Sequence, residues 1–183
     1  ITSVLGWVQL QRRGALDAAG SDAAMARIEA ESRRMAALVE ELLLLARLDE
    51  QRPLHLVAID LAAVAADAVT DARAVEAERP LTLDAPAPVI VMGDPDRVRQ
   101  VIDNLLRNVR VHTPAAAPAT VRVFAEGGCA RVVVEDSGPG IDPESLPHVF
   151  DRFWRRDHSR TRATGGAGLG LAIVTALAAA HGG

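Results

Sequence analysis

The chain has 183 residues, of which 49% are hydrophobic, and its formal net charge is −4 at pH 7. A chain of this size can bury one core, or the core of a small domain with a helical extension. Its single cysteine, Cys129, excludes an intrachain disulfide framework and a multi-cysteine zinc site. The acidic balance argues against general affinity for nucleic acid, and no apolar run is long enough to cross a bilayer. We therefore expect a soluble, cytoplasmic chain that contacts neither nucleic acid nor a membrane.

Residues 1–52 are predicted to form two helices. Apolar side chains at positions 1, 4, 5 and 8 fall on one helical face, and the segment 14–20 supplies a loop. Ser21 or Asp22 can cap a second helix that runs to about Leu48. Two such helices make a hairpin, and its apolar stripe can be covered by a second hairpin in a dimeric four-helix bundle or by the downstream domain. The stripe has near-heptad spacing and consists of Met25, Ile28, Met35, Leu38, Leu42 and Leu45.

From Pro53 onward the pattern changes to mixed α and β structure. Strands are predicted where aliphatic and β-branched residues recur between Pro and Gly breaks, and helices where Asp60 and Asp94 can cap the segments that follow them. Residues 137–167 are rich in Gly, Pro and Arg and are expected to form a long loop with one short helix. The other predicted elements are strands at 57–60, 81–85 and 89–93, helices over about 61–77 and 95–111, a hairpin at 120–136 that turns at Gly127-Gly128, and a final helix from about 170.

The segment RQVIDNLLRNVRVHTP holds the first candidate site residues. Asn104 and Asn108 are four residues apart, so they lie on one face of a helix, and Val101, Leu105 and Val109 are expected on its packing side. Two carboxamides one turn apart can bind a hard cation through oxygen or donate to phosphate oxygens. Asparagines at this spacing are also common on solvated helix surfaces, so the pattern alone leaves both interpretations open.

The segment VEDSGPGI places Asp136 at the end of a strand, immediately before a sharp Gly-Pro-Gly turn. A flat ligand can lie against such a backbone, and the carboxylate can accept a hydrogen bond from an exocyclic amine. A plain turn without a ligand is the alternative.

The segment TGGAGLGLAIV, residues 164–174, combines closely spaced glycines with the start of an apolar helix. Uncovered N–H groups and the helix dipole favour an anion at such a start, and five arginines lie just upstream, at 152, 155, 156, 160 and 162. No strand precedes the glycines, which excludes a dinucleotide-binding fingerprint. The pattern predicts a polyphosphate site, with a solvated arginine loop as the alternative.

Taken in order, these segments resemble the ATPase domain of sensor histidine kinases. DPDRVRQVIDNLLRNVRVHTP is similar to the N box of that family, DSGPGI to its G1 box, VFDRFWR to its F box and GGAGLGLAIV to its G2 box. The helices of residues 1–52 resemble the family's dimerisation and phosphotransfer hairpin. The resemblance implies an α+β fold: a helical hairpin over 1–52 that forms a dimeric four-helix bundle, then a two-layer α/β sandwich ATPase domain of the GHKL type over 53–183.

The resemblance also implies a bound ATP with Mg²⁺ and a role for each matching residue. Asn108 would ligate Mg²⁺, Asn104 would support the phosphate end, Asp136 would accept from the adenine amino group, and His112 would lie beside the base. Of the arginines, Arg156 or Arg160 would reach the γ-phosphate. The remaining ATP-binding positions are Gly138 and Gly140 at the adenine pocket, Phe150 and Phe153, which would pack a mobile lid formed by the loop of residues 137–167 against the core, and Gly166, Gly168, Leu169 and Gly170 at the phosphates.

Two departures from the family pattern imply that the chain is part of a longer protein. The family's phosphoacceptor lies in a His-Glu segment directly before a stretch like ITSVLGWVQL, so none of the five histidines of this chain is assigned as the acceptor. Relatives also continue past HGG into a further pair of strands. The resemblance therefore implies the cytoplasmic portion of a membrane-anchored bacterial sensor, with a homodimer partner and a response regulator.

The expected activity is transfer of the ATP γ-phosphate to a histidine. Related ATP hydrolases carry a glutamate four residues before the metal-binding Asn as a general base, and here that position is Asn104, which cannot take a proton at neutral pH. Kinase chemistry is compatible with this loss because imidazole is itself the nucleophile. An ATP hydrolase and a non-catalytic dimerisation scaffold remain the alternatives.

Overall fold

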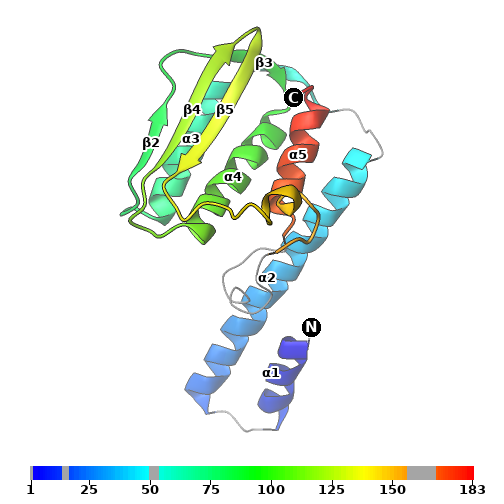
Figure 1. Ribbon diagram of the computed structural model, residues 1–183. Helices are drawn as coiled ribbons and strands as arrows, with labels where there is room; N and C mark the ends of the chain where they lie inside the picture. The colour runs from blue at the N-terminus through cyan, green and yellow to red at the C-terminus, as the bar shows by residue number, and fades with distance from the viewer. Residues whose placement is uncertain (1, 14–16, 50–53, 156–167) are drawn as a thin grey trace. The chain divides into compact units, whose positions relative to one another are not determined.

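The structure, a computed structural model, describes residues 2–13, 17–49, 54–155 and 168–183. The chain divides into two compact units, residues 1–46 and 47–183, which are described separately (Figure 1). The domain boundary predicted at Pro53 lies outside the described residues. Within the described ranges, no helix combines the length and the apolar character that a bilayer crossing requires.

The first unit is built from α1 (Thr2–Arg12) and α2 (Ala18–Asp49). The predicted cap of the second helix, Ser21 or Asp22, is wrong, because α2 begins before either residue. The side chain of Asp17 accepts a hydrogen bond of 2.8 Å from the Gly20 N–H and so occupies the capping position. Two alanines, which favour helix, follow Asp17 and allow this earlier start.

The two helices contact each other near the start of α2. The guanidinium carbon of Arg27 lies 4.7 Å from the centroid of the Trp7 ring of α1, which is a cation–π contact. Ala24, one turn before Arg27, is buried with only 1% of its surface exposed. Residues from both helices therefore take part in the packing of the first unit.

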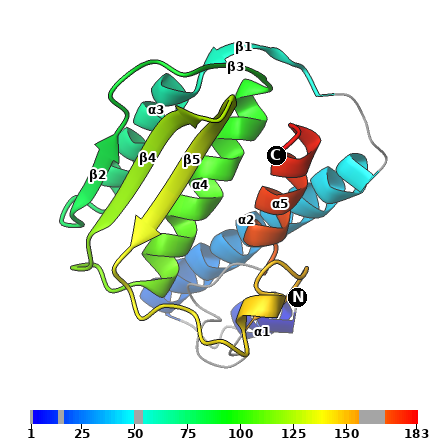
Figure 2. The same ribbon diagram turned by 45° about the horizontal axis from the view of Figure 1, so that its top comes forward.

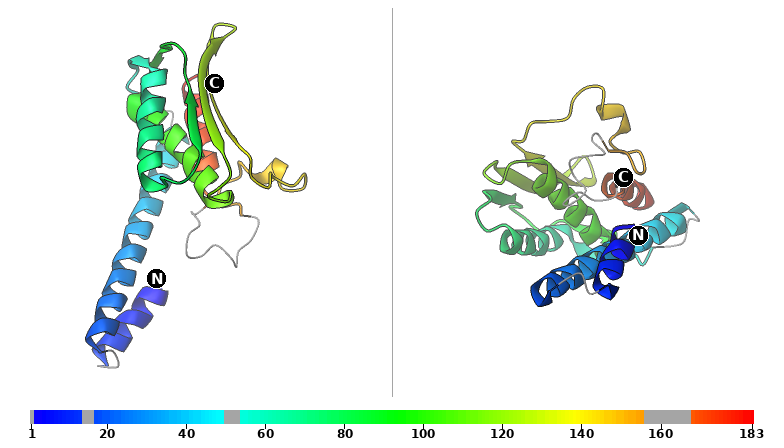
Figure 3. Two further views of the ribbon diagram at one scale, coloured as in Figure 1. Left: turned by 90° about the vertical axis from the view of Figure 1, so that its left-hand side faces the viewer. Right: turned by 90° about the horizontal axis from the view of Figure 1, so that it is seen from below.

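The second unit has two layers, a mixed sheet with helices on one face (Figure 3). In the three-stranded sheet, β2 runs parallel to β4, and β4 runs antiparallel to β5; β1 and β3 form a separate antiparallel pair. The elements are β1 (Val57–Asp60), α3 (Leu61–Val75), β2 (Leu81–Asp84), β3 (Ile90–Gly93), α4 (Pro95–His112), β4 (Ala119–Glu126), β5 (Cys129–Asp136), the short 3₁₀ helix η1 (Leu146–His148) and α5 (Gly170–Ala180). This is the α+β class that the sequence predicts.

Both predicted aspartate caps are confirmed. The Asp60 carboxylate accepts from the Ala62 N–H at 3.0 Å at the start of α3, and its same oxygen accepts from the Val89 N–H, also at 3.0 Å. The Asp94 carboxylate accepts from the Arg97 N–H at 3.2 Å at the start of α4. Asp60 therefore joins the beginning of α3 to the approach to β3, in addition to capping the helix.

The predicted hairpin is confirmed over its whole length. Gly127 and Gly128 have φ angles of +60° and +83°, a turn conformation that glycine adopts without steric cost. The register then pairs every residue of β4 with one of β5, ending with Ala119 opposite Asp136. The turn chemistry thus places Asp136 at the end of the sheet where β4 begins.

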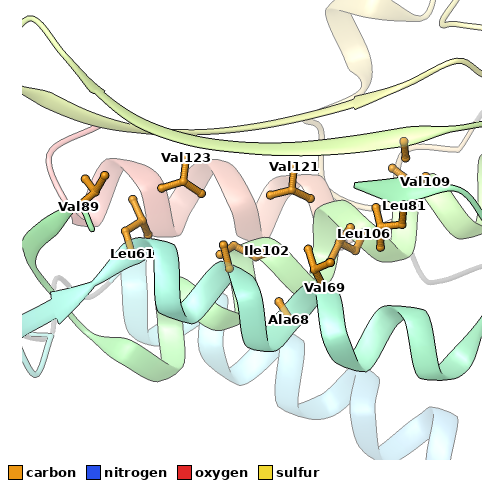
Figure 4. Close-up of a cluster of buried hydrophobic side chains, with 12 residues drawn as sticks. Leu61, Ala68, Val69, Leu81, Val89, Ile102, Leu106, Val109, Val121 and Val123 are labelled. Carbon is orange, nitrogen blue, oxygen red and sulfur yellow. The ribbon is translucent and has the colours of Figure 1, made fainter. Parts of the chain in front are cut away.

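The core lies between the sheet and the helices (Figure 4). Val121 and Val123 of β4 point toward the helices and are almost completely buried, and Ile102 of α4 and Val69 of α3 meet them from the other layer. The alternation along β4, buried at every second residue, is the pattern of a strand with one covered face.

Helix α5 lies alongside α4 (Figure 2). The ring nitrogen Nε2 of His181, just after α5, accepts a hydrogen bond of 3.1 Å from the N–H of Asp94, and Nδ1 lies 2.8 Å from the carbonyl oxygen of Leu177. Because one partner is a donor and the other an acceptor, this pairing uses the tautomer that carries a proton on Nδ1. His181 therefore fastens the end of α5 to the beginning of α4.

Candidate functional site

One face of α4 carries the polar residues Asn104, Asn108 and His112, each one turn after the previous one. At 1.5 Å per residue the row extends over about 12 Å. The two asparagines are half-buried and His112 is exposed. Neither carboxamide has a hydrogen-bond partner among the residues that the structure describes. Half-buried amides without protein partners are able to bind a ligand through both oxygen and NH₂ groups.

The apolar side of α4 differs from the prediction. Val101 and Leu105 are only half-buried, and Val109 alone of the predicted set is buried. The helix packs against α3 on one side and α5 on the other, so its apolar arc is wider than a single stripe. The residues that α4 buries are Ile102, Leu106 and Val109.

The end of β5 meets the end of α4. One carboxylate oxygen of Asp136 accepts a hydrogen bond of 2.8 Å from the Gly138 N–H, which fixes the side chain over the turn. A Cβ atom at Gly138 would lie 2.5 Å from Cγ2 of Thr113, the residue that follows α4. The second oxygen of the exposed Asp136 carboxylate has no partner within the described ranges and can accept a further hydrogen bond.

The start of α5 meets the first asparagine of α4. A Cβ atom at Gly170 would lie 3.5 Å from Oδ1 of Asn104, so the backbone of the first turn of α5 runs beside that carboxamide. Leu169 occupies the N-cap position without a side-chain cap, which leaves first-turn N–H groups for another acceptor. The Leu169 side chain is completely buried, so this residue can offer a ligand only its main chain.

The predicted packing of Phe150 and Phe153 against the core is not found. The two side chains are 54% and 53% exposed. Phe153 has a φ angle of +65°, and its N–H donates a hydrogen bond of 2.9 Å to the carbonyl oxygen of Gly168. Gly168 has a φ angle of +75°. This bond holds the main chain before and after residues 156–167 together, while both rings stay on the surface.

One described glycine of the predicted site does not contact the polar row of α4. Gly140 has a φ of +72° and no atom within 4 Å of its Cβ position, so it shapes the turn without touching a neighbour. Arg156, Arg160 and Gly166 lie outside the described residues.

Two residues at the site were not predicted from the sequence. Thr113 contacts the Asp136–Gly138 turn, and Arg79 is a buried arginine that donates to the Thr113 hydroxyl at 2.7 Å. Thr113 directly follows His112, so its position next to the polar row could have been noticed. Arg79 belongs to no motif, because its role depends on partners 34 to 38 residues further along the chain.

The part of the site that the structure describes offers few metal ligands of its own. The described residues contain no group of three or more His, Cys, Asp and Glu side chains that could bind a metal by themselves. Mg²⁺ prefers oxygen ligands and takes one or two from the protein when phosphate oxygens supply the others. The carboxamide oxygen of Asn108, in the middle of the row, fits that pattern.

Known proteins match the part of the chain that carries these residues. Residues 93–183, which include α4, β5 and α5, match the family described as "Histidine kinase-, DNA gyrase B-, and HSP90-like ATPase". The chain is 42% identical, over 184 aligned residues and 100% of its length, to the Mycobacterium tuberculosis protein named "Probable sensor histidine kinase TcrY". The chain belongs to the sensor histidine kinase family.

Further relatives extend the comparison. It is 40% identical over 99% of its length to sensor histidine kinase TrcS of M. tuberculosis. The structure of full-length ShkA in complex with AMPPNP matches 98% of this chain and 38% of its own, with a TM-score of 0.72 and 28% identity. The chain spans 39% of the length of TcrY and 37% of that of TrcS.

Proposed function

We propose that the chain is the ATP-binding catalytic part of a two-component sensor histidine kinase. The observation that carries this proposal is the meeting of two separate segments with α4: the start of α5 lies beside Asn104, and the Asp136–Gly138 turn lies beside Thr113, the residue that follows the helix. A row of about 12 Å between these two ends suits an extended nucleoside triphosphate. The AMPPNP bound in the ShkA structure, an ATP analogue, is consistent with this ligand.

The adenine base binds at the end of β5 in this proposal. The free oxygen of the Asp136 carboxylate accepts a hydrogen bond from the exocyclic amino group, and His112 lies beside the base. Gly138 lets the main chain approach closely, since a side chain there would collide with Thr113. The same carboxylate would face the carbonyl oxygen of guanine, so the site prefers adenine.

The phosphates bind toward the start of α5. The main-chain N–H groups at Gly168, Leu169 and Gly170 face the negative oxygens, and the dipole of α5 adds a favourable field. Asn104 donates to a phosphate oxygen from the neighbouring helix. Asn108 ligates Mg²⁺, which neutralises charge on the phosphates when it is bound.

The reaction is transfer of the γ-phosphoryl group to an imidazole nitrogen. The new N–P bond forms as the bond between the γ-phosphorus and the bridging oxygen breaks, and ADP leaves with the electron pair of that bond. No general base is needed at Asn104, since a neutral imidazole nitrogen already carries the attacking lone pair. The chain's own residues contribute by positioning and by stabilising charge. One of the lid arginines, Arg156 or Arg160, contacts the γ-phosphate.

The remaining parts of the proposal concern the whole protein. The helices of residues 1–52 form a dimeric four-helix bundle that belongs to the phosphotransfer module, and residues 53–183 form the catalytic domain, which two further strands complete. The phosphorylated histidine passes its phosphoryl group to a response regulator. The protein is a membrane-anchored bacterial sensor, and this portion lies in the cytoplasm.

Isothermal titration with Mg²⁺ and AMPPNP tests the nucleotide site. Asn108→Ala removes the metal ligand and is expected to abolish the Mg²⁺ dependence of binding, whereas Asn108→Asp keeps an oxygen ligand and retains it. Asp136→Asn keeps the oxygen that accepts from Gly138 but replaces the second acceptor with a donor, so AMPPNP affinity falls. Unchanged affinity in both Asn108→Ala and Asp136→Asn would overturn the assignment.

Radiolabelled ATP separates the kinase from the hydrolase. The kinase proposal expects acid-labile label on a supplied histidine-containing hairpin, while a hydrolase releases phosphate steadily without any acceptor. Turnover to free phosphate with no labelled protein would favour the hydrolase and contradict the proposal.

A further inference from the structure

Arg79 is a buried cation in the second unit, with 7% of its surface exposed. A buried charge is costly unless it is paired and fully hydrogen-bonded. The guanidinium satisfies this condition by donating to six oxygens. Two are the carboxylate oxygens of Glu76, at 2.6 and 3.4 Å, and the others are Thr113 Oγ1, Thr113 O, Pro114 O and Ala117 O, at 2.7 to 3.3 Å. Four of the six oxygens belong to residues 113–117, so Arg79 holds the segment that leaves α4.

The contact with Thr113 fixes the orientation of that side chain. The Thr113 hydroxyl accepts a hydrogen bond from Arg79 and donates its only proton to the carbonyl oxygen of Val109 at 2.7 Å, so it is held from two sides. With Oγ1 fixed, Cγ2 is fixed as well, and it is the atom that lies 2.5 Å from the Cβ position of Gly138. Arg79 therefore acts on the Asp136–Gly138 turn through Thr113.

A second connection runs along the segment itself. The carbonyl oxygens of Pro114 and Ala117 accept from Arg79, and the next residue, Pro118, accepts a hydrogen bond of 3.0 Å from the Ser137 N–H. Ala119 is paired with Asp136 in the sheet. The segment anchored by Arg79 is thus the one against which the turn of β5 is built.

We infer that Arg79 is a positioning residue for the adenine end of the nucleotide site. It acts at a distance, by holding Thr113 and residues 114–117 where Asp136 and Gly138 require them. This inference rests on the proposed function, since it assigns the effect to base recognition. Arg79 also lines a cavity of about 250 Å³ between α3 and α4. It is not an anion site of its own, because its N–H groups already donate to protein oxygens.

The test compares two pairs of variants of the chain. Arg79→Met removes the donors but keeps the length of the side chain, and its matched control is Arg73→Met, which removes an arginine of α3 that donates to the Leu81 carbonyl oxygen. Thr113→Val keeps the shape of the side chain but loses the hydroxyl, whereas Thr113→Ser keeps the hydroxyl. The measured quantities are the dissociation constants for the Mg²⁺ complexes of AMPPNP and GMPPNP, the melting temperature, and hydrogen–deuterium exchange over residues 113–140.

The base preference, the ratio of the GMPPNP to the AMPPNP dissociation constant, is the decisive readout. We expect Arg79→Met and Thr113→Val to lower it about tenfold, the effect of losing one well-placed hydrogen bond, and to speed exchange at Ser137 and Gly138. Arg73→Met keeps the wild-type ratio. Thr113→Ser keeps both hydrogen bonds of the hydroxyl but loses the Cγ2 atom beside Gly138, so it lowers the ratio less than Thr113→Val does. A lower melting temperature with an unchanged ratio in Arg79→Met would show a merely structural role and overturn the inference. If Arg79→Met does not fold, equal ratios for Thr113→Val and Thr113→Ser overturn it.

The proposed function and the inference fail in different ways. If the wild-type chain binds neither analogue, the proposed nucleotide site is wrong, and the assignment to base recognition fails with it. If the wild type prefers AMPPNP and the Arg79→Met and Thr113→Val variants keep that preference, the nucleotide site stands and the inference is wrong. Unchanged exchange over residues 136–138 in Arg79→Met contradicts the positioning itself in either case.

Discussion

Substitution of Gly138 by alanine tests the geometry of the adenine end most directly. Gly138 is not one of the glycines with a positive φ, so alanine can adopt its backbone conformation and any effect is steric. The added Cβ would lie 2.5 Å from Thr113 Cγ2 and 2.6 Å from Asp136 Oδ1. Ordinary van der Waals contact begins at 3.4 Å, so the gap to Thr113 must open by about 0.9 Å.

The cost of that movement follows from what holds the two neighbours. Thr113 is fixed by hydrogen bonds of 2.7 Å to Arg79 and to the Val109 carbonyl oxygen, and Asp136 by its bond to the Gly138 N–H. Losing one or two such bonds costs roughly 1–3 kcal/mol. Since 1.4 kcal/mol corresponds to about a tenfold change in affinity, AMPPNP affinity should fall about 10- to 100-fold.

Isothermal titration with Mg²⁺ and AMPPNP measures this effect, with differential scanning calorimetry on the same sample. Gly6→Ala is the matched control, because nothing lies within 4 Å of its Cβ position in α1, and it should keep the wild-type affinity. Wild-type affinity and melting temperature in Gly138→Ala would refute the reasoning, since they would mean that the turn can move without consequence.

Three further substitutions are expected to act on stability. Ile102→Ala empties a completely buried position and should cost about 2–5 kcal/mol in urea unfolding; a cost below that range would mean that the core can collapse around the gap. Arg99→Gln removes ion pairs whose hydrogen bonds, to Asp71 first and then to Asp103, raise the pKa of the guanidinium. Because the pKa of Arg99 is raised in the folded state, its ion pairs stabilise the fold fully below the unfolded pKa, and this stabilisation is lost only as pH rises through the folded pKa. The contribution should therefore stay constant across the neutral range, and below about 1 kcal/mol because these ion pairs are exposed; denaturation at low and high salt checks it. Gly168→Ala places a Cβ atom at a residue with a φ of +75°, only 2.6 Å from the Trp154 carbonyl oxygen, and should lower the free energy of unfolding by about 1–3 kcal/mol; thermal melts of wild type and variant measure this loss.

The fold could be predicted where the determining interactions are local. Asp60 and Asp94 cap helices within three residues of themselves, and Gly127-Gly128 turns the hairpin whose strands lie on either side of it. The start of α2 was predicted incorrectly because several residues there could cap a helix, and the preference for Asp17 depends on which side chain reaches an N–H group.

The candidate site could be predicted only in part. Asn104, Asn108 and Asp136 belong to short motifs, so their chemistry is visible in the sequence, and the structure adds that Gly170 and Gly138 bring the other segments to the same helix. The surface position of Phe153 depends on tertiary packing, which a motif does not record.

The hydrogen bond between His181 and Asp94 has a consequence for the order of folding. It joins residues 87 apart in the chain, whereas the Asp60–Val89 bond joins residues 29 apart. Closing a loop three times as long costs about 1 kcal/mol more in chain entropy. We therefore expect the sheet and α3 to assemble with α4 first and α5 to dock last. In the proposed site, the adenine end would then be complete before the phosphate end.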